Sequence, residues 1–224
     1  AHQLPACQLI MEENQHVAVL DFGSQYTQLI VRRVRELGYF AKLYSPEDIA
    51  EIGTPGAIIL SGGPKSTSEP DAPDIDFEKL KSYGVPVLGV CYGMQLLNIK
   101  FGGSVKASNK REYGPAMLAP TTHEDLYADV SAESQVWMSH SDTVQDLHDD
   151  VEVIASNQHG TPVSLKWPGG FFGIQFHPEV THSHEGNKIL NNFLQQAEKL
   201  QPFHIEDFKR EIIQGIRAVV GERQ

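Results

Sequence analysis

The sequence has few cysteines and no long apolar run. Its 224 residues include only two cysteines, Cys7 and Cys91, which stand far apart in unlike surroundings. Two such cysteines do not form a disulfide framework, so the sequence predicts a reduced, cytoplasmic protein. Its apolar runs are short, for example Ala57 to Leu60, whereas a membrane-spanning helix needs about 18 apolar residues. Residues 1–15 lack a basic start and a long apolar stretch, which excludes a secretory signal and favours a poorly ordered leader.

Basic residues are also scarce in comparison with acidic ones. Eighteen Lys and Arg stand against 29 Asp and Glu, which gives a formal net charge of −11. Such a surface repels phosphate backbones and anionic lipids, so we expect neither a nucleic acid nor a membrane as a partner. Because 40% of the residues are hydrophobic, the chain is long and apolar enough for one substantial core.

The first hundred residues alternate the patterns of buried strands and amphipathic helices. Apolar strands are expected at His16 to Gly23, Tyr39 to Tyr44, Ala57 to Leu60 and Val85 to Val90. Helices are expected at about 26–37, 77–83 and from Cys91 to about Phe101. Strands and helices that alternate at this spacing predict a mostly parallel central sheet with helices on both of its faces.

The pattern changes after Gly102, where short β-prone segments follow one another. These segments are Val136 to Ser139, Val151 to Ala155, Val163 to Trp167 and Phe171 to Phe176, and we expect them as antiparallel strands added beside the parallel set. A helix from about Glu185 to Leu200 follows. Residues 16–200 are therefore predicted to form one α/β domain.

A separate segment follows Pro202, which interrupts the helical pattern. Residues 201–224 carry an apolar stripe at helical spacing, made of Ile205, Phe208, Ile212, Ile213, Ile216, Val219 and Val220. The stripe predicts a helix that either folds back on its own domain or leads, as a linker, into a further one.

The segment Gly89-Val90-Cys91-Tyr92-Gly93 has the pattern of a nucleophile elbow, with Cys in place of the usual Ser. An apolar strand enters it, a helix leaves it, and glycine on both sides permits the tight turn. The thiol of Cys91 would then lie at a helix N-terminus, where the helix dipole favours the thiolate. The alternative is a small buried core cysteine, which the two flanking glycines disfavour.

A thiol nucleophile needs a base, and a base needs a group that orients it. His177 directly follows the predicted strand Phe171 to Phe176. Side chains of residues i and i+2 in an extended chain point to the same side. Glu179 can therefore orient the imidazole of His177. The alternatives are a surface His–Glu pair without a role, or a metal site that adds His182 and His184. Their spacing matches no standard metal motif, so we interpret His182 and His184 as surface residues.

An oxyanion hole is the third expected part. Ser61-Gly62-Gly63-Pro64 follows a parallel strand at the sheet edge where Cys91 emerges, so glycine N–H groups there, together with that of Tyr92, can stabilise an oxyanion. The competing interpretation is a phosphate-binding loop. It fails because Pro64 interrupts the required Gly–Lys junction.

These three motifs, in this order, resemble the class I (triad) glutamine amidotransferase family over residues 16 to about 197. The resemblance implies L-glutamine as substrate and no cofactor in this chain. It implies Cys91 as nucleophile, His177 as base, Glu179 as its orienting group, backbone at Gly62, Gly63 and Tyr92 for the oxyanion, and Gln95, Ser141 and Asp142 for glutamine recognition. Ser141 stands where the family usually has glycine.

Further motifs resemble one branch of that family, in which the amidotransferase domain works with an ATP-pyrophosphatase (synthetase) domain. They are Asp21 to Tyr26, Lys110 to Gly114, Val136 to His140 and Gln175 to His182. The resemblance implies a synthetase domain on the same polypeptide, ATP and Mg²⁺ bound by that domain, and a homodimer of the full-length enzyme. Two alternatives stay open: another Cys-elbow hydrolase, such as a γ-glutamyl hydrolase, and a catalytically silent domain that binds a partner.

Overall fold

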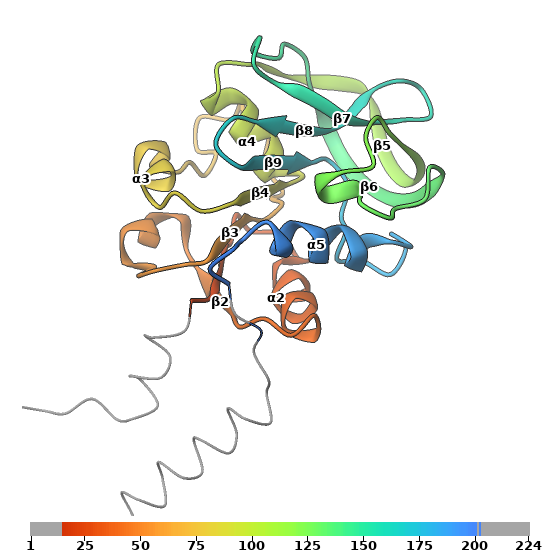
Figure 1. Ribbon diagram of the computed structural model, residues 1–224. Coiled ribbons are helices and arrows are strands. Elements are labelled where there is room, and N and C mark those ends of the chain that lie inside the picture. Colours follow the sequence, from red (N-terminus) through yellow and green to blue (C-terminus); the bar gives the residue numbers. More distant parts are fainter. Residues whose placement is uncertain (1–14, 201, 203–224) are drawn as a thin grey trace, which may run out of the picture.

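A nine-stranded sheet runs through the centre of the molecule (Figure 1). The computed structural model describes residues 15–200 and 202, so the predictions for the leader and for the helix after Pro202 lie outside the described residues. Across the sheet the strand order is β2-β1-β3-β4-β9-β8-β7-β5-β6. The first half of this order is parallel and the second half antiparallel, which confirms the predicted fold class.

The parallel half consists of short strands that are buried on both faces, except at β2. It contains β1 (Val17–Leu20), β2 (Ala41–Tyr44), β3 (Ala57–Leu60), β4 (Val87–Val90) and β9 (Phe171–Ile174). Strand β1 pairs with β2 and β3, and β4 pairs with β3 and β9, all in parallel. Strands that helices cover on both sides have no solvent face, which is why they are continuous apolar runs.

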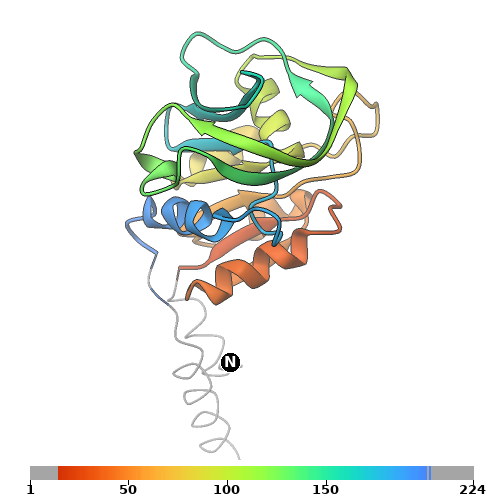
Figure 2. The ribbon, with the colours of Figure 1, turned by 90° about the vertical axis from the view of Figure 1, so that its right-hand side faces the viewer.

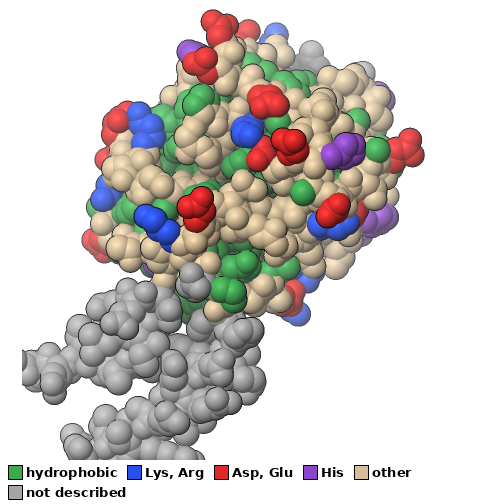
Figure 3. Space-filling view, viewed as in Figure 1, with side chains coloured by type: hydrophobic (Ala, Val, Ile, Leu, Met, Phe, Trp, Pro, Cys, Tyr) green, Lys and Arg blue, Asp and Glu red, His purple; other side chains and the backbone are tan. Residues whose placement is uncertain are grey.

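Helices cover the two faces because strand side chains alternate between them. The helices are α2 (Thr27–Glu36), α3 (Phe77–Ser82), α4 (Tyr92–Lys100) and α5 (Gly186–Gln195), with 3-10 turns η1 (Pro46–Glu51) and η2 (Asp125–Tyr127). Val17 and Val19 share one core with α2 and α5, whereas Ala18 and Leu20 share the other core with α3 and α4 (Figures 1 and 2). Charged side chains are scattered over the face shown in Figure 3. Within the described ranges, no helix is both long and apolar enough to cross a membrane.

The antiparallel half differs from the sequence prediction in two elements. Strand β5 (Val105–Pro120) was not expected, and β6 (Ser134–Val144) is longer than the predicted segment. These two form a long ribbon, the β5–β6 ribbon, which Figure 2 shows at the front. Strands β7 (Glu152–Asn157) and β8 (Pro162–Trp167) are antiparallel, as predicted.

Strand β9 corrects the prediction that all later strands are antiparallel additions. It pairs antiparallel with β8, yet it pairs in parallel with β4 through Val87–Phe171 to Val90–Ile174. The hydrophobic pattern of a strand gives its faces but not its direction, so the sequence could not reveal this. The consequence is that β4 and β9 end side by side, and the residues that follow them meet at one edge of the sheet.

Candidate active site

Cys91 lies in a strained turn between β4 and α4. Its backbone has φ +52° and ψ −103°, a conformation that residues other than glycine seldom adopt. Neighbouring strands fix the turn on both sides, since the Cys91 N–H donates to the Ile174 carbonyl at 2.8 Å and the Gly93 N–H donates to the Ser61 carbonyl at 3.2 Å. The strand–turn–helix geometry is that of a nucleophile elbow.

The two glycines of the elbow are required by close approach of the backbone. A Cβ atom on Gly89 would lie 2.5 Å from the carbonyl carbon of Gly93, and one on Gly93 would lie 2.5 Å from the carbonyl oxygen of Leu60. No side chain fits at either position. Helix α4 can therefore begin directly above β3 and β4, with Cys91 at its N-terminus.

His177 is held from two sides, by Glu179 and by the backbone of Trp137. The ring atom Nδ1 of His177 lies 2.7 Å from Oε1 of Glu179. The backbone N–H of His177 donates to the Trp137 carbonyl at 3.0 Å. Glu179 is only 1% exposed, and its Oε2 has no hydrogen-bond partner among the described residues. Arg33 of α2 donates to the Glu179 carbonyl at 3.0 Å. The Glu179 carboxylate therefore acts on the imidazole and keeps a proton on Nδ1.

The charge state of His177 follows from its neighbours. Burial alone would lower its pKa, but the Cys91 sulfur and the Glu179 carboxylate outweigh burial and raise the pKa to about 10. His140, which is also buried, shows the opposite result, because burial dominates there and lowers its pKa. At neutral pH His177 therefore carries two protons, which is the state that stabilises a neighbouring thiolate.

Three residues beside the Cys91 sulfur or the His177 ring are not among the predicted site residues: Gln175, Ser139 and Tyr26. Gln175 Nε2 lies 3.6 Å from the sulfur, and the sulfur lies 3.6 Å from the Ser139 carbonyl oxygen. Tyr26 packs edge-on against the His177 ring, with 5.2 Å between ring centroids. The sequence could have indicated Gln175, because it lies two residues before His177 in an extended segment and so points to the same side. Contacts of Ser139 and Tyr26 depend on tertiary packing.

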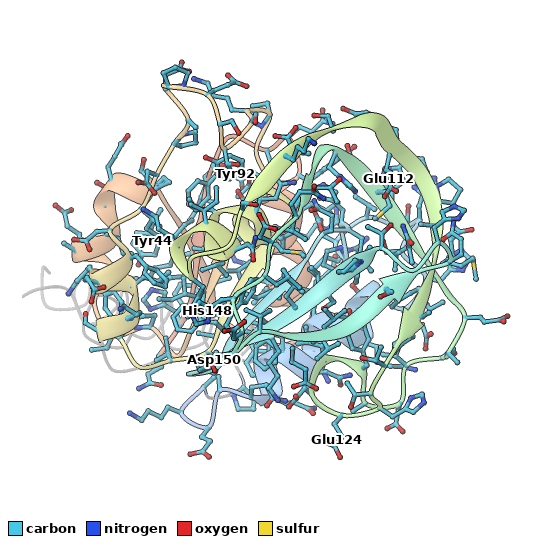
Figure 4. The ribbon with its side chains drawn as sticks, turned by 90° about the horizontal axis from the view of Figure 1, so that it is seen from above. Tyr44, Tyr92, Glu112, Glu124, His148 and Asp150 are labelled. Atoms are coloured by element: carbon cyan, nitrogen blue, oxygen red, sulfur yellow. The ribbon has the colours of Figure 1, made fainter. Side chains whose placement is uncertain are left out.

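A cavity of about 420 Å³ lies at the elbow, a volume suited to a small ligand. Figure 4 shows the β5–β6 ribbon arching beside α4, with Tyr92 and Glu112 labelled on the two elements. Most of the predicted site residues line this cavity: Gly63, Cys91, Tyr92, Gln95, Ser141, Asp142 and His177. Gly62 does not, but a Cβ on it would lie 3.1 Å from His177 Cε1 and 3.5 Å from Cys91 Cβ. Glu179 lies behind His177. Their roles in catalysis stay predictions.

Backbone donors are available beside Cys91. The N–H groups of Gly62, Gly63 and Tyr92 donate no hydrogen bond within the part of the chain that the structure describes. Ser61 fixes this loop, because its hydroxyl accepts from the Phe22 N–H at 3.0 Å and donates to the Gly62 carbonyl at 2.8 Å. Unused N–H groups next to a nucleophile can stabilise a developing oxyanion.

The far side of the cavity is polar and carries a buried carboxylate. Gln95 Nε2 donates to the Asp142 carbonyl at 2.9 Å and to Gln175 Oε1 at 3.2 Å. The Asp142 carboxylate accepts from the hydroxyls of Ser66 and Ser141, and no Lys, Arg or His among the described residues forms an ion pair with it. Ser141 has no positive φ, so serine is accommodated here without backbone strain. A buried, unpaired carboxylate suits a cationic group of a ligand.

The two histidines of the alternative metal site, His182 and His184, contact other residues. The His182 side chain is exposed, and its ring lies 4.6 Å from that of Trp137, whereas His184 Nε2 lies 3.4 Å from Gln135. Among residues 15–200 and 202, no group of three or more His, Cys, Asp or Glu side chains is placed to hold a metal ion.

Comparisons with known proteins agree with one another. Residues 18–197 match the model of the family "Glutamine amidotransferase class-I". The chain is 46% identical over 211 residues to the glutamine-hydrolyzing GMP synthase of Thermosipho africanus, covering 92% of this chain and 40% of that protein. It is 44% identical over 218 residues to the same enzyme of Staphylococcus aureus, covering 95% of this chain and 42% of that protein. The chain thus spans about two fifths of the length of these relatives.

Solved structures show the same architecture. A Thermoplasma acidophilum protein, described as a candidate subunit of GMP synthase, is 29% identical with a TM-score of 0.74, covering 83% of this chain and 94% of that one. A glutamine amidotransferase of Thermotoga maritima is 18% identical with a TM-score of 0.65, covering 83% of this chain and 99% of that one.

Proposed function

Because this chain belongs to the class-I glutamine amidotransferase family, we propose that it hydrolyses the side-chain amide of L-glutamine with a triad of Cys91, His177 and Glu179. The observation that carries the proposal is the position of His177. Its Nδ1 is 2.7 Å from Glu179, its pKa is raised by Cys91 and Glu179, and it shares one cavity with the elbow. A nucleophile, a base and an orienting carboxylate are what acyl transfer from an amide requires.

In the first step the Cys91 thiolate attacks the amide carbon of glutamine, while His177 holds the proton that the thiol has lost. A C–S bond forms, and the carbonyl electrons move to the oxygen. The N–H groups of Gly62, Gly63 and Tyr92 stabilise this oxyanion. One such donor typically contributes a factor of about 10² to 10³ in rate.

In the second step His177 gives its proton to the amide nitrogen, the C–N bond breaks, and ammonia leaves. A γ-glutamyl thioester remains on Cys91. Water then attacks this thioester, with His177 as the base that takes a proton from it. A C–O bond forms, the C–S bond breaks, and glutamate is released while Cys91 leaves as the thiolate beside protonated His177. Throughout the cycle Glu179 stabilises the imidazolium and fixes its tautomer.

The polar side of the cavity recognises the amino-acid end of glutamine. The Asp142 carboxylate is buried, lacks a cationic partner among the described residues, and suits the α-ammonium group. Gln95 and the backbone around Ser141 position the rest of the substrate, and Gln95 is itself fixed by its bonds to Asp142 and Gln175.

The ammonia is used by a second domain. The relatives are GMP synthases about two and a half times as long as the part that this chain matches. We therefore assign the receiving step to an ATP-pyrophosphatase domain that binds ATP and Mg²⁺, adenylylates xanthosine monophosphate and aminates it to GMP. The full-length enzyme would be a homodimer.

The test is glutamate release by residues 1–224, measured for the wild type, Cys91→Ala and Cys7→Ala. Cys91→Ala should lose at least about 10³-fold in kcat, since nucleophile and base act as a unit. Its melting temperature should stay close to that of the wild type, and Cys7→Ala should remain fully active. Glutaminase activity that survives Cys91→Ala would refute the triad.

A labelling experiment adds a second measurement. A diazoketone analogue of glutamine should modify Cys91 and spare Cys7, because only Cys91 has a helix N-terminus and a histidine beside it. Mass spectrometry of the digested protein locates the label. Faster hydrolysis of a γ-glutamyl peptide than of glutamine would favour a γ-glutamyl hydrolase instead.

A further inference from the structure

One stretch of the outward face of the β5–β6 ribbon, at residues 113–117 and 135–139, is uncharged and partly apolar. Residues directly opposite each other on paired strands point to the same side, and here the odd-numbered positions point outward. We call this face the ribbon strip. It consists of three cross-strand pairs, Tyr113–Ser139, Pro115–Trp137 and Met117–Gln135.

The ribbon strip is exposed along β5, whereas its three β6 residues are half-buried and the Trp137 ring lies 4.6 Å from that of His182. Tyr113 is 63% exposed and Met117 is 39% exposed, and Pro115 between them is exposed as well. None of its six residues carries a charge, although the chain has a net charge of −11. Leu43 and Ile99 are other exposed large apolar residues, at 37% and 38%, but they lie on β2 and α4. Contiguous apolar surface, unlike isolated residues, marks an interaction site.

The ribbon strip begins at the mouth of the active-site cavity. Tyr113 and Ser139 both line that cavity, and the exposure of Tyr113 places it at the rim. From this pair the strip continues along the ribbon through Pro115 and Trp137 to Met117 and Gln135. A partner seated on the strip would therefore stand beside the opening through which ammonia leaves.

The strand beneath the strip also holds the proposed base. The Trp137 carbonyl accepts the His177 N–H at 3.0 Å, and the Trp137 N–H donates to the Ser183 hydroxyl at 3.0 Å. That hydroxyl in turn donates to the His177 carbonyl. A partner that fixes Trp137 would thus fix the backbone of His177 on both sides.

We propose that the ribbon strip is the docking surface for the synthetase domain, an inference that rests on the proposed function. Three observations select this occupant: the strip borders the ammonia exit, it lacks charge as the centre of a stable interface does, and the relatives extend well beyond this chain. Seated there, the synthetase domain covers the cavity mouth, so ammonia reaches it before water can protonate it.

The test uses this chain together with its synthetase domain, either on one polypeptide or added as a separate protein. Two variants are compared, and the residues that they replace are exposed to a similar extent. Met117→Lys places a charge in the ribbon strip, and Leu43→Lys places one on β2. Met117→Lys should reduce glutamine-dependent GMP synthesis at least fivefold and leave ammonium-dependent GMP synthesis unchanged. Leu43→Lys should change neither rate. Glutaminase activity of residues 1–224 alone should be the same in both variants and the wild type.

Three results would overturn the docking surface: undiminished glutamine-dependent synthesis in Met117→Lys, an equal loss in Leu43→Lys, or an equal loss with ammonium. The proposed function fails separately, if residues 1–224 show no Cys91-dependent glutaminase activity. A photo-crosslinking residue, p-benzoylphenylalanine, at position 117 gives a second measurement. It should link this chain to the synthetase domain, and the same residue at position 43 should not. Links between two copies of this chain would assign the strip to self-association instead.

Discussion

Cys91 and Glu179 together raise the pKa of His177, and the contribution of Glu179 is open to a direct test. Burial lowers the pKa of His177, whereas the Cys91 sulfur and the Glu179 carboxylate raise it to about 10. In Glu179→Gln burial still lowers the pKa of His177, but the Glu179 carboxylate no longer raises it, so the pKa must fall. His177 then loses its proton at a lower pH, and with it the acid that expels ammonia.

We therefore expect the alkaline limb of the kcat profile to move toward lower pH in Glu179→Gln, by about one unit or more. The measurement is glutamate release between pH 6 and pH 10. Glu78→Gln on α3 removes an exposed carboxylate that is remote from the site and should leave the profile in place. An unchanged limb in Glu179→Gln would show that Glu179 does not set the protonation of His177.

Individual site residues were predictable only where a local motif marks them. The glycines around Cys91 and the alternation of His177 with Glu179 are visible in the sequence, because each reflects a constraint between near neighbours. The contact of Ser139 with the Cys91 sulfur joins residues 48 apart. It depends on how β6 passes the elbow, so no local pattern indicates it.

At the scale of elements, the elbow depends on the contact of α4 with β3. In Gly93→Ala the new Cβ would meet the Leu60 carbonyl oxygen at 2.5 Å, so α4 must shift. Overpacking of this kind typically costs about 1–3 kcal/mol of stability, and the shift displaces Cys91 and Tyr92 as well. We expect Gly93→Ala to lower both the free energy of unfolding and the glutaminase rate, as urea melts and glutamate release would measure.

Gly160→Ala serves as the control for this prediction. Its added Cβ meets nothing within 4 Å, and only its φ of +75° opposes the substitution. This costs about 1–2 kcal/mol and leaves α4 in place. Gly160→Ala should therefore lose stability but keep full glutaminase activity. Equal activity in the two variants would argue against the close approach of α4 and β3.

Among the elements, the sequence predicted the parallel strands and their helices better than the later strands. Buried strands such as β3 and β4 are apolar throughout, and each is followed by loop or helix signals. Strand β5 contains Gly114, Pro115 and Pro120, which ordinarily interrupt a strand, and a bulge between Ala107 and Glu112 breaks its register. Its pairing with β6 and β7 compensates for these breaks, and such pairing is not encoded locally.

At the scale of the whole molecule, the glutaminase should depend on its neighbour. Residues 1–224 alone should make no GMP and release glutamate slowly. Addition of the synthetase domain, ATP and xanthosine monophosphate should raise glutamate release at least about fivefold, which corresponds to a modest coupling free energy. A free chain that already matches the rate of the assembled system would contradict the coupling and leave the triad proposal intact.

The position of β9 between β4 and β8 also governs when the site comes into being. The chain is made from its N-terminus, and Gln175 follows Cys91 by 84 residues. At about 5–20 residues per second, a ribosome needs roughly 4 to 17 s to cover that distance. During this interval the nascent thiol has no imidazole beside it, because β9 has yet to insert next to β4. Under the proposed mechanism a growing chain therefore cannot hydrolyse glutamine, because the base joins the nucleophile only when β9 completes the sheet.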